Sequence, residues 1–169
     1  MATLVVNAGS SSHKLVLFDD GGSRRWSGAI DWSDRGGALA QSLGQLHQAL
    51  APLLVEAGGA AGPITAVGHR IVHGGDGFRS AVVLDAGVTE ALEALRRLAP
   101  LHNGPALDTL AVLRPLVPTA WHGAAFDTAF HRSLPPEAAT YALPADWRDR
   151  KSTRLNTSHE WISRMPSSA

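Results

Sequence analysis

The chain has 169 residues, of which 44% are hydrophobic and 18% charged, and its 15 basic residues balance its 15 acidic ones. This composition is typical of a water-soluble globular domain, and a net charge of zero argues against a general nucleic-acid binder. There is no cysteine, which excludes disulfides and thiolate metal sites, and no signal-peptide or membrane-spanning pattern, so we expect a cytoplasmic protein without a membrane partner.

The first 19 residues predict a β-hairpin whose turn can bind an anion. An apolar run ends at Asn7, a turn of small residues follows at 8–12, and a second apolar run starts at Lys14. Backbone N–H groups in a turn of glycine and serine can surround a phosphate, and lysine binds phosphate as a point charge. Ser10 and Ser12 would add hydroxyl donors, and Asn7 an oxygen for a hard cation. An ordinary serine-rich hairpin is the alternative.

The rest of the chain predicts alternating helices and strands, and therefore a mixed α/β sheet with ligands at the strand ends. Glycine-rich residues 58–63 are expected to stop the first helix. We expect 100–104 to be a loop in which Asn103 caps the next helix. The elements are strands at 23–30, 64–67, 81–84 and 119–126, and helices at 38–57, 89–98 and 103–114.

A second unusual stretch surrounds Arg70. Its guanidinium can bind a carboxylate or a phosphate through two parallel hydrogen bonds, and His69 and His73 could donate to the same anion. Gly74 and Gly75 would let the backbone come close to it. In the alternative reading the two histidines cap carbonyls at a strand end. Zinc binding by the histidines is not expected, because i, i+4 ligation needs a helix.

A third candidate is Asp127, which emerges from the strand predicted at 119–126. A carboxylate there could act as a general base or position an acceptor by its charge, whereas the alternative is a local turn with Thr128. His102 lies in the expected loop, where a lone histidine is usually structural.

Together these segments resemble the acetate kinase (acetokinase) family. The similarity covers residues 1 to about 148 and rests on four sequence motifs in the family's order. They are VVNAGSSSHK at 5–14, VGHRIVHGG at 67–75, PLHN at 100–103 and FDTAFH at 126–131.

The resemblance implies reversible transfer of the γ-phosphoryl group of ATP to acetate, with Mg²⁺, or Mn²⁺ in its place, in a homodimer. It implies an α/β fold of the ribonuclease-H-like type shared with actin, Hsp70 and sugar kinases. The implied roles are Asn7 near the metal, Ser10, Ser12 and Lys14 at the ATP phosphate, Arg70 on the acceptor carboxylate, Val72 and Leu101 around its methyl group, His102 beside that pocket, and Asp127 as the catalytic acid.

Residues 149–169 depart from the family pattern. They resemble a translated sequencing adapter, so we expect a disordered, non-native tail after an incomplete N-terminal domain at 1–148, truncated before the family's second domain. A chain of this kind is expected to be inactive. The alternatives are a propionate- or butyrate-type carboxylate kinase and a non-catalytic anion- or nucleotide-binding fragment.

Overall fold

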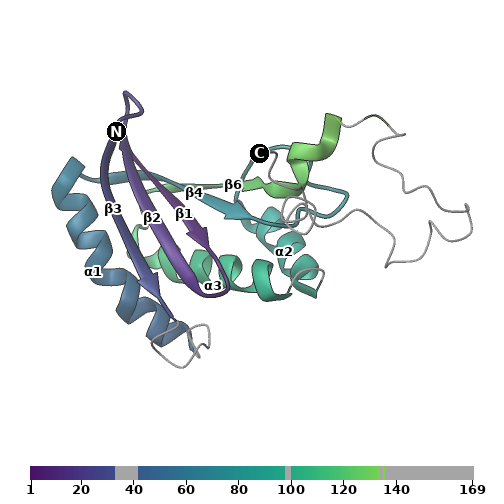
Figure 1. The fold of residues 1–169 in the computed structure, drawn as a ribbon, viewed down its shortest axis with the longest axis horizontal. Helices are drawn as coiled ribbons and strands as arrows, with labels where there is room; N and C mark the ends of the chain where they lie inside the picture. The colour runs from purple at the N-terminus through teal and green to yellow at the C-terminus, as the bar shows by residue number, and fades with distance from the viewer. Residues whose placement is uncertain (33–41, 98–99, 134, 136–169) are drawn as a thin grey trace, which may run out of the picture.

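The computed structural model describes residues 1–32, 42–97, 100–133 and 135, which form a six-stranded mixed sheet with helices (Figure 1). The strand order is β3-β2-β1-β4-β6-β5, with β1, β4 and β6 mutually parallel and the remaining pairs antiparallel. The predicted mixed α/β sheet is thereby confirmed. The elements are β1 (Ala2–Ala8), β2 (Ser12–Asp19), β3 (Arg24–Asp31), α1 (Leu43–Ala61), β4 (Ile64–Ile71), β5 (Val82–Val83), α2 (Ala86–Ala94), the 3₁₀ helix η2 (Leu95–Arg97), α3 (Pro100–Leu116), β6 (Trp121–Phe126) and the 3₁₀ helix η3 (Asp127–Ser133).

Helices α1 and α3 pack against one face of the sheet, and that face supplies the core. Successive strand side chains point to opposite faces, so the buried Leu4 and Val6 of β1 meet the buried leucines of α1 there. The side chains between them, such as the exposed Val5, belong to the opposite face. The polar side chains of the strands lie mainly on this second face, which we call the open face.

Helix α1 extends further than its sequence predicts. The expected stop at 58–63 is wrong at its beginning, because Gly58 and Gly59 remain helical and the helix ends at Ala61. Among the glycines of 58–63, Gly62 alone adopts a positive φ, of 81°, and its N–H donates to the Gly58 carbonyl. This left-handed backbone is the conformation for which glycine is favoured, and Pro63 follows it. None of the helices in the described part of the chain is long and apolar enough to cross a membrane.

The largest correction concerns α3. The predicted loop at 100–104 is wrong, because the helix begins at Pro100 and includes Asn103 and Pro105. Asn103 is fully buried and does not cap the helix; its side-chain amide binds the backbone of His73 instead. A partner distant in sequence therefore overrides the local preference of asparagine for helix ends.

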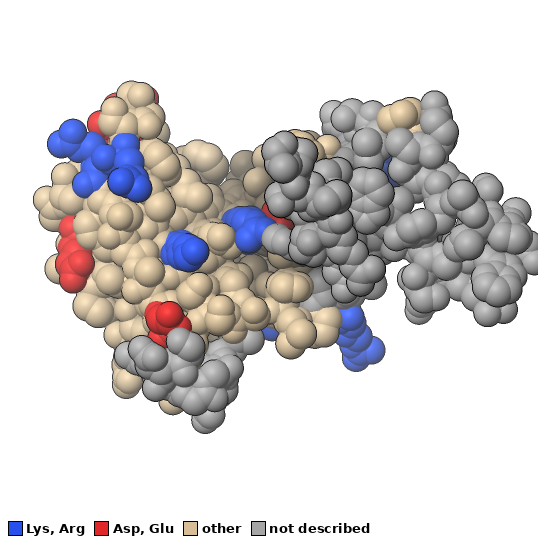
Figure 2. Space-filling view, in the orientation of Figure 1, with Lys and Arg blue, Asp and Glu red and all other residues tan. Residues whose placement is uncertain are grey.

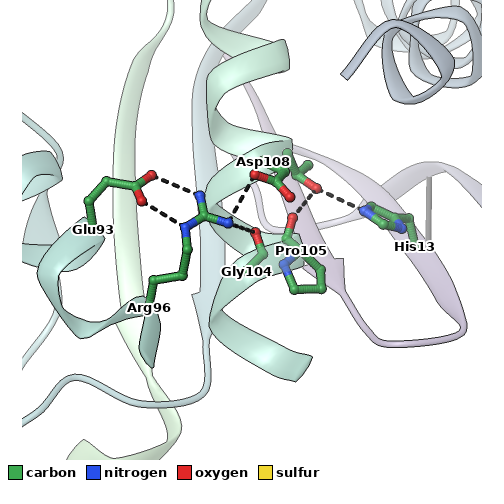
Figure 3. Close-up of polar contacts among 7 residues, drawn as sticks. His13, Glu93, Arg96, Gly104, Pro105 and Asp108 are labelled. Carbon is green, nitrogen blue, oxygen red and sulfur yellow. Dashed lines mark hydrogen bonds and ion pairs between the residues drawn. The ribbon is translucent and has the colours of Figure 1, made fainter. Parts of the chain in front are cut away.

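Arg96 of η2 forms hydrogen bonds that connect η2 to helix α3 (Figure 3). Its guanidinium donates to both carboxylate oxygens of Glu93, at 2.8 and 2.9 Å, and to the Asp108 carboxylate at 3.1 Å. It also donates to the Gly104 carbonyl at 3.3 Å. The hydrogen bonds from Arg96 lower the pKa of Glu93. Through these contacts Arg96 links η2 to the first turns of α3.

A second polar connection, inside the core, joins β2 to α3 (Figure 3). The Trp32 indole N–H donates to Nδ1 of His13 at 2.8 Å, so the ring hydrogen of His13 lies on Nε2 and is donated to the Thr109 hydroxyl, also at 2.8 Å. Thr109 donates in turn to the Pro105 carbonyl at 2.7 Å. Burial lowers the pKa of His13 to about 4, which keeps the ring neutral. The strand that carries Lys14 is thus fixed to α3.

Candidate active site on the open face

Three of the predicted site residues occupy one row across the sheet. Lys14 of β2 pairs with Asn7 of β1, and Asn7 pairs with Arg70 of β4. Paired residues share a face, and neighbouring strands are about 4.8 Å apart, so the three side chains stand side by side. The row lies on the open face, opposite α1 and α3. In Figure 2 the middle of the face shown carries few charged side chains, and a basic one touches an acidic one beside the grey region.

Arg70 is the centre of the polar contacts in this row. It donates through Nε to Oδ1 of Asp127 at 2.9 Å and through Nη2 to Oδ2 at 2.5 Å, and Nη1 donates to Oδ1 of Asn7 at 2.9 Å. Asp127 follows β6 directly, as predicted, and it forms an ion pair with Arg70. Hydrogen bonding to Asp127 raises the pKa of Arg70, which secures the positive charge there.

The two serines predicted to bind phosphate lie at the hairpin turn next to this row. Ser10 is exposed at the tip, and Ser12 lies two residues before Lys14 and so on the same side of β2. The Gly9 N–H donates to the Ser12 carbonyl at 2.8 Å, which closes the turn. A side chain at Gly9 would come within 3.2 Å of that carbonyl, a close contact for any other residue. Among the described residues, the Lys14 ammonium is in no ion pair.

Of the two histidines near Arg70, His69 lies on the other face of the sheet and His73 lies beyond the end of β4. His69 is buried on the helix-covered side, where its Nε2 lies 3.0 Å from Nδ1 of His122. The idea that His69 donates to the anion bound by Arg70 is therefore wrong, and the alternation of side chains along a strand explains why. His73 is also buried, and its Nδ1 accepts from the Gly75 N–H at 2.9 Å. Burial lowers the pKa of His69 to about 3.

The segment after β4 is held from two sides, and we call residues 72–74 the clamped loop. On one side, Asn103 Oδ1 accepts from the His73 N–H at 3.0 Å, and Nδ2 donates to the His73 carbonyl at 2.9 Å. On the other, the Thr128 N–H donates to the Val72 carbonyl at 3.2 Å, and its hydroxyl accepts from the Gly74 N–H at 3.1 Å. Sequence reasoning missed both clamps, because nothing in the spacing links residues 103 and 128 to residue 73.

The clamped loop, which carries Val72, lies next to the first turn of α3, which carries Leu101 and His102. Val72 is half-buried within the loop, and Leu101 and His102 are exposed on the first turn of α3, next to Asn103. Because the Asn103 amide reaches the His73 backbone directly, the turn that carries Leu101 lies alongside the loop that carries Val72. Asp127 joins the same region through its neighbour Thr128.

We expect Gly74→Ala to lower the free energy of unfolding by about 1–3 kcal/mol. A Cβ at position 74 would lie 2.7 Å from the Phe78 carbonyl oxygen and 2.9 Å from the Phe78 Cβ, so the clamped loop would have to shift. Gly77→Ala is the matched control, because a Cβ there meets no atom within 4 Å. Urea unfolding of both variants measures the difference, and equal stabilities would contradict the close packing at Gly74.

The described residues contain no group of three or more His, Asp or Glu side chains that could hold a metal ion. The Asn7 oxygen proposed for a hard cation accepts a hydrogen bond from Arg70. A carbonyl oxygen has two acceptor positions, and Mg²⁺ at phosphate sites takes one or two protein ligands with water and phosphate for the rest. Asn7 therefore fits a magnesium–phosphate complex and does not form a metal site by itself.

Comparisons with known proteins show the family and the fold of this chain. Solved structures with the same fold include acetate kinases from Entamoeba histolytica (TM-score 0.66, 28% identity, 87% of this chain and 40% of that one) and Porphyromonas gingivalis (TM-score 0.69, 25% identity, 90% and 44%). A propionate kinase from Francisella tularensis has a TM-score of 0.66 at 27% identity, over 96% of this chain and 47% of that one. The fold is the ribonuclease-H-like one of actin, Hsp70 and sugar kinases.

The chain belongs to the acetokinase family, whose model matches residues 32–168. The acetate kinase of Protochlamydia amoebophila is 34% identical over 190 residues, which cover 96% of this chain and 48% of that protein. That of Pseudomonas aeruginosa PAO1 is 38% identical over 188 residues, covering 95% and 45%. The chain thus spans about half the length of these relatives. The family match includes most of residues 149–169, whose structure lies outside the described residues, and their adapter origin stays a prediction.

Proposed function

We propose that this chain is the N-terminal half of a carboxylate kinase that transfers the γ-phosphoryl group of ATP to acetate. The observation that carries the proposal is the row of Lys14, Asn7 and Arg70, completed by Asp127, on the open face of a sheet with the acetate kinase fold. Two cationic side chains flank one amide there, which suits the joint binding of a phosphate and a carboxylate.

Phosphoryl transfer requires alignment and charge neutralisation more than covalent help from the protein. Acetate is already ionised at neutral pH, so its oxygen attacks the γ-phosphorus directly, a C–O–P linkage forms, and the bond from phosphorus to the ADP oxygen breaks. In our proposal Lys14, Ser10 and Ser12 bind the transferred phosphoryl group.

Arg70 binds the acceptor carboxylate in this proposal, and Val72, Leu101 and His102 surround the acceptor. Asp127 was predicted to be the catalytic acid. Its two hydrogen bonds to Arg70 favour a role in orienting the guanidinium, since an ionised acceptor needs no base.

Mg²⁺, or Mn²⁺ in its place, would neutralise the ATP phosphates, and Asn7 is the residue in this chain that would contact it. We also propose that the complete protein acts in the cytoplasm, where ATP is available, and as a homodimer. The 169-residue chain alone is proposed to be inactive, because it spans about half of its active relatives' length. A propionate kinase is the second candidate, since one shares the fold at 27% identity.

The test is an acyl-phosphate assay of the complete gene product, with hydroxylamine to trap the product as a hydroxamate. We expect hydroxamate to form from ATP, Mg²⁺ and acetate, more slowly from propionate and butyrate, and not at all with the 169-residue chain alone. Lys14→Met should lower kcat by about a hundredfold, because a charge on the transferred phosphoryl group is lost. A complete protein that phosphorylates none of these acceptors would refute the proposal, and faster turnover of propionate would favour the second candidate.

A further inference from the structure

We propose that Asn103 is a positioning residue that sets the acyl-chain preference of the site, by fixing the distance between the clamped loop and the first turn of α3. This inference rests on the proposed function, because it concerns the acceptor pocket of that same site. Asn103 contacts no substrate in the proposal; it acts through the backbone of His73.

The first step is the double hydrogen bond of the Asn103 amide. It satisfies both the N–H and the carbonyl of His73 within 3.0 Å, although no sheet partner is available to that residue after β4 ends at Ile71. Asn103 is fully buried, so water cannot readily replace either bond. A short side chain with one donor and one acceptor therefore holds the loop at a single distance from the helix.

The second step is the position of the residues on either side of this link. Val72 immediately precedes His73, and Leu101 lies two residues before Asn103 on α3. These are the two apolar side chains proposed to enclose the methyl group of the acceptor. The Asn103 amide links the two backbone segments that carry them, and so it sets the distance between these segments.

The third step is the anchoring of the opposite side of the loop. The Thr128 backbone and hydroxyl hold Val72 and Gly74, and the adjacent Asp127 is paired with Arg70. The contacts with Thr128 therefore connect the clamped loop to the residues around Arg70. The contact with Asn103 connects the loop to the turn of α3 that carries Leu101. Loosening the Asn103 link should widen the pocket while Arg70 stays in place.

The experiment compares acetate, propionate and butyrate as acceptors for the complete gene product and two variants. Asn103→Leu keeps the branched shape of the side chain but leaves both His73 backbone groups unpaired. Asn103→Ser is smaller, leaves space for a bridging water and is expected to disturb folding less. We expect KM for acetate to rise and the acetate-to-propionate ratio of kcat/KM to fall by about tenfold, since one methylene in a pocket is worth 10- to 200-fold. KM for ATP should stay the same.

Thr89→Val is the matched control, because it removes a hydroxyl that accepts from Arg114 and donates to the Asp85 carbonyl, on α2 and away from the clamped loop. It should leave the acceptor ratio unchanged. A folded Asn103→Ser protein whose ratio stays within about twofold of the parent would overturn the inference, even if kcat drops. If the parent itself phosphorylates no carboxylate, the proposed function fails and the role of Asn103 falls with it.

Discussion

Substituting glutamine for Arg70 should raise KM for acetate by about 10- to 100-fold in the complete protein, because hydrogen bonds between charged groups are worth about 1.5–3 kcal/mol each. kcat should fall as well. The substitution removes the guanidinium that joins Asn7 and Asp127, and it leaves the Asp127 carboxylate, only 20% exposed, without its bidentate partner. Steady-state kinetics with acetate and with ATP as the varied substrate measure the two effects separately.

Arg96→Gln is the control for this experiment. Arg96 also forms a bidentate pair with a carboxylate, and its side chain is 34% exposed compared with 35% for Arg70. We expect Arg96→Gln to lower the free energy of unfolding by about 1 kcal/mol, the upper value for an ion pair near the surface, and to leave KM for acetate unchanged. Equal increases in KM for the two variants would show that Arg70 acts only through stability.

The free energy of unfolding should already decrease at pH values well above those at which carboxylates titrate. Burial lowers the pKa of His13 to about 4 and that of His69 to about 3, from an ordinary value of 6.5, and it also lowers the pKa of His122. The unfolded chain therefore takes up these protons first, and stability falls as pH decreases below 6.5. His13 and His69 together should cost about 4 kcal/mol between pH 7.5 and pH 5.

Urea unfolding of the chain at pH 7.5 and pH 5 measures this loss. His69→Gln removes one of the buried titrating groups and should reduce the pH-dependent loss by about 2 kcal/mol. His47→Gln, on the exposed side of α1, should leave the loss as it is in the parent. A parent protein equally stable at both pH values would mean that these histidines are not held neutral in the core.

The parts of the fold that the sequence predicts are those with local signals. The hairpin follows from two apolar runs around a turn of small residues, and the leucine spacing of α1 follows from the one face it buries. The predictions are wrong where a contact with a residue distant in sequence determines the local structure. Asn103 has the local preference of a helix cap, but its partner is His73, thirty residues earlier, and so the first turn of α3 was assigned to a loop.

In the candidate site, too, some features are predictable from local sequence and others depend on tertiary contacts. The residue types and their positions at turns and strand ends make Asn7, Lys14, Arg70 and Asp127 candidates, and the sheet register places the first three in one row. The predicted strand at 64–67 ends too early: β4 continues to Ile71, and the alternation of side chains along it separates His69 from Arg70. The clamp by Thr128 and the chain of hydrogen bonds through His13 depend on tertiary contacts, for which the spacing of these residues gives no signal.

The central claim is that the row on the open face binds the acceptor through Arg70. A crystal structure of the complete protein with acetate and a non-hydrolysable ATP analogue tests it most directly. We predict that the acetate carboxylate accepts hydrogen bonds from the Arg70 guanidinium, with its methyl group toward Val72 and Leu101 and the terminal phosphate near Lys14. Acetate bound away from Arg70, with the terminal phosphate remote from Lys14, would contradict the account.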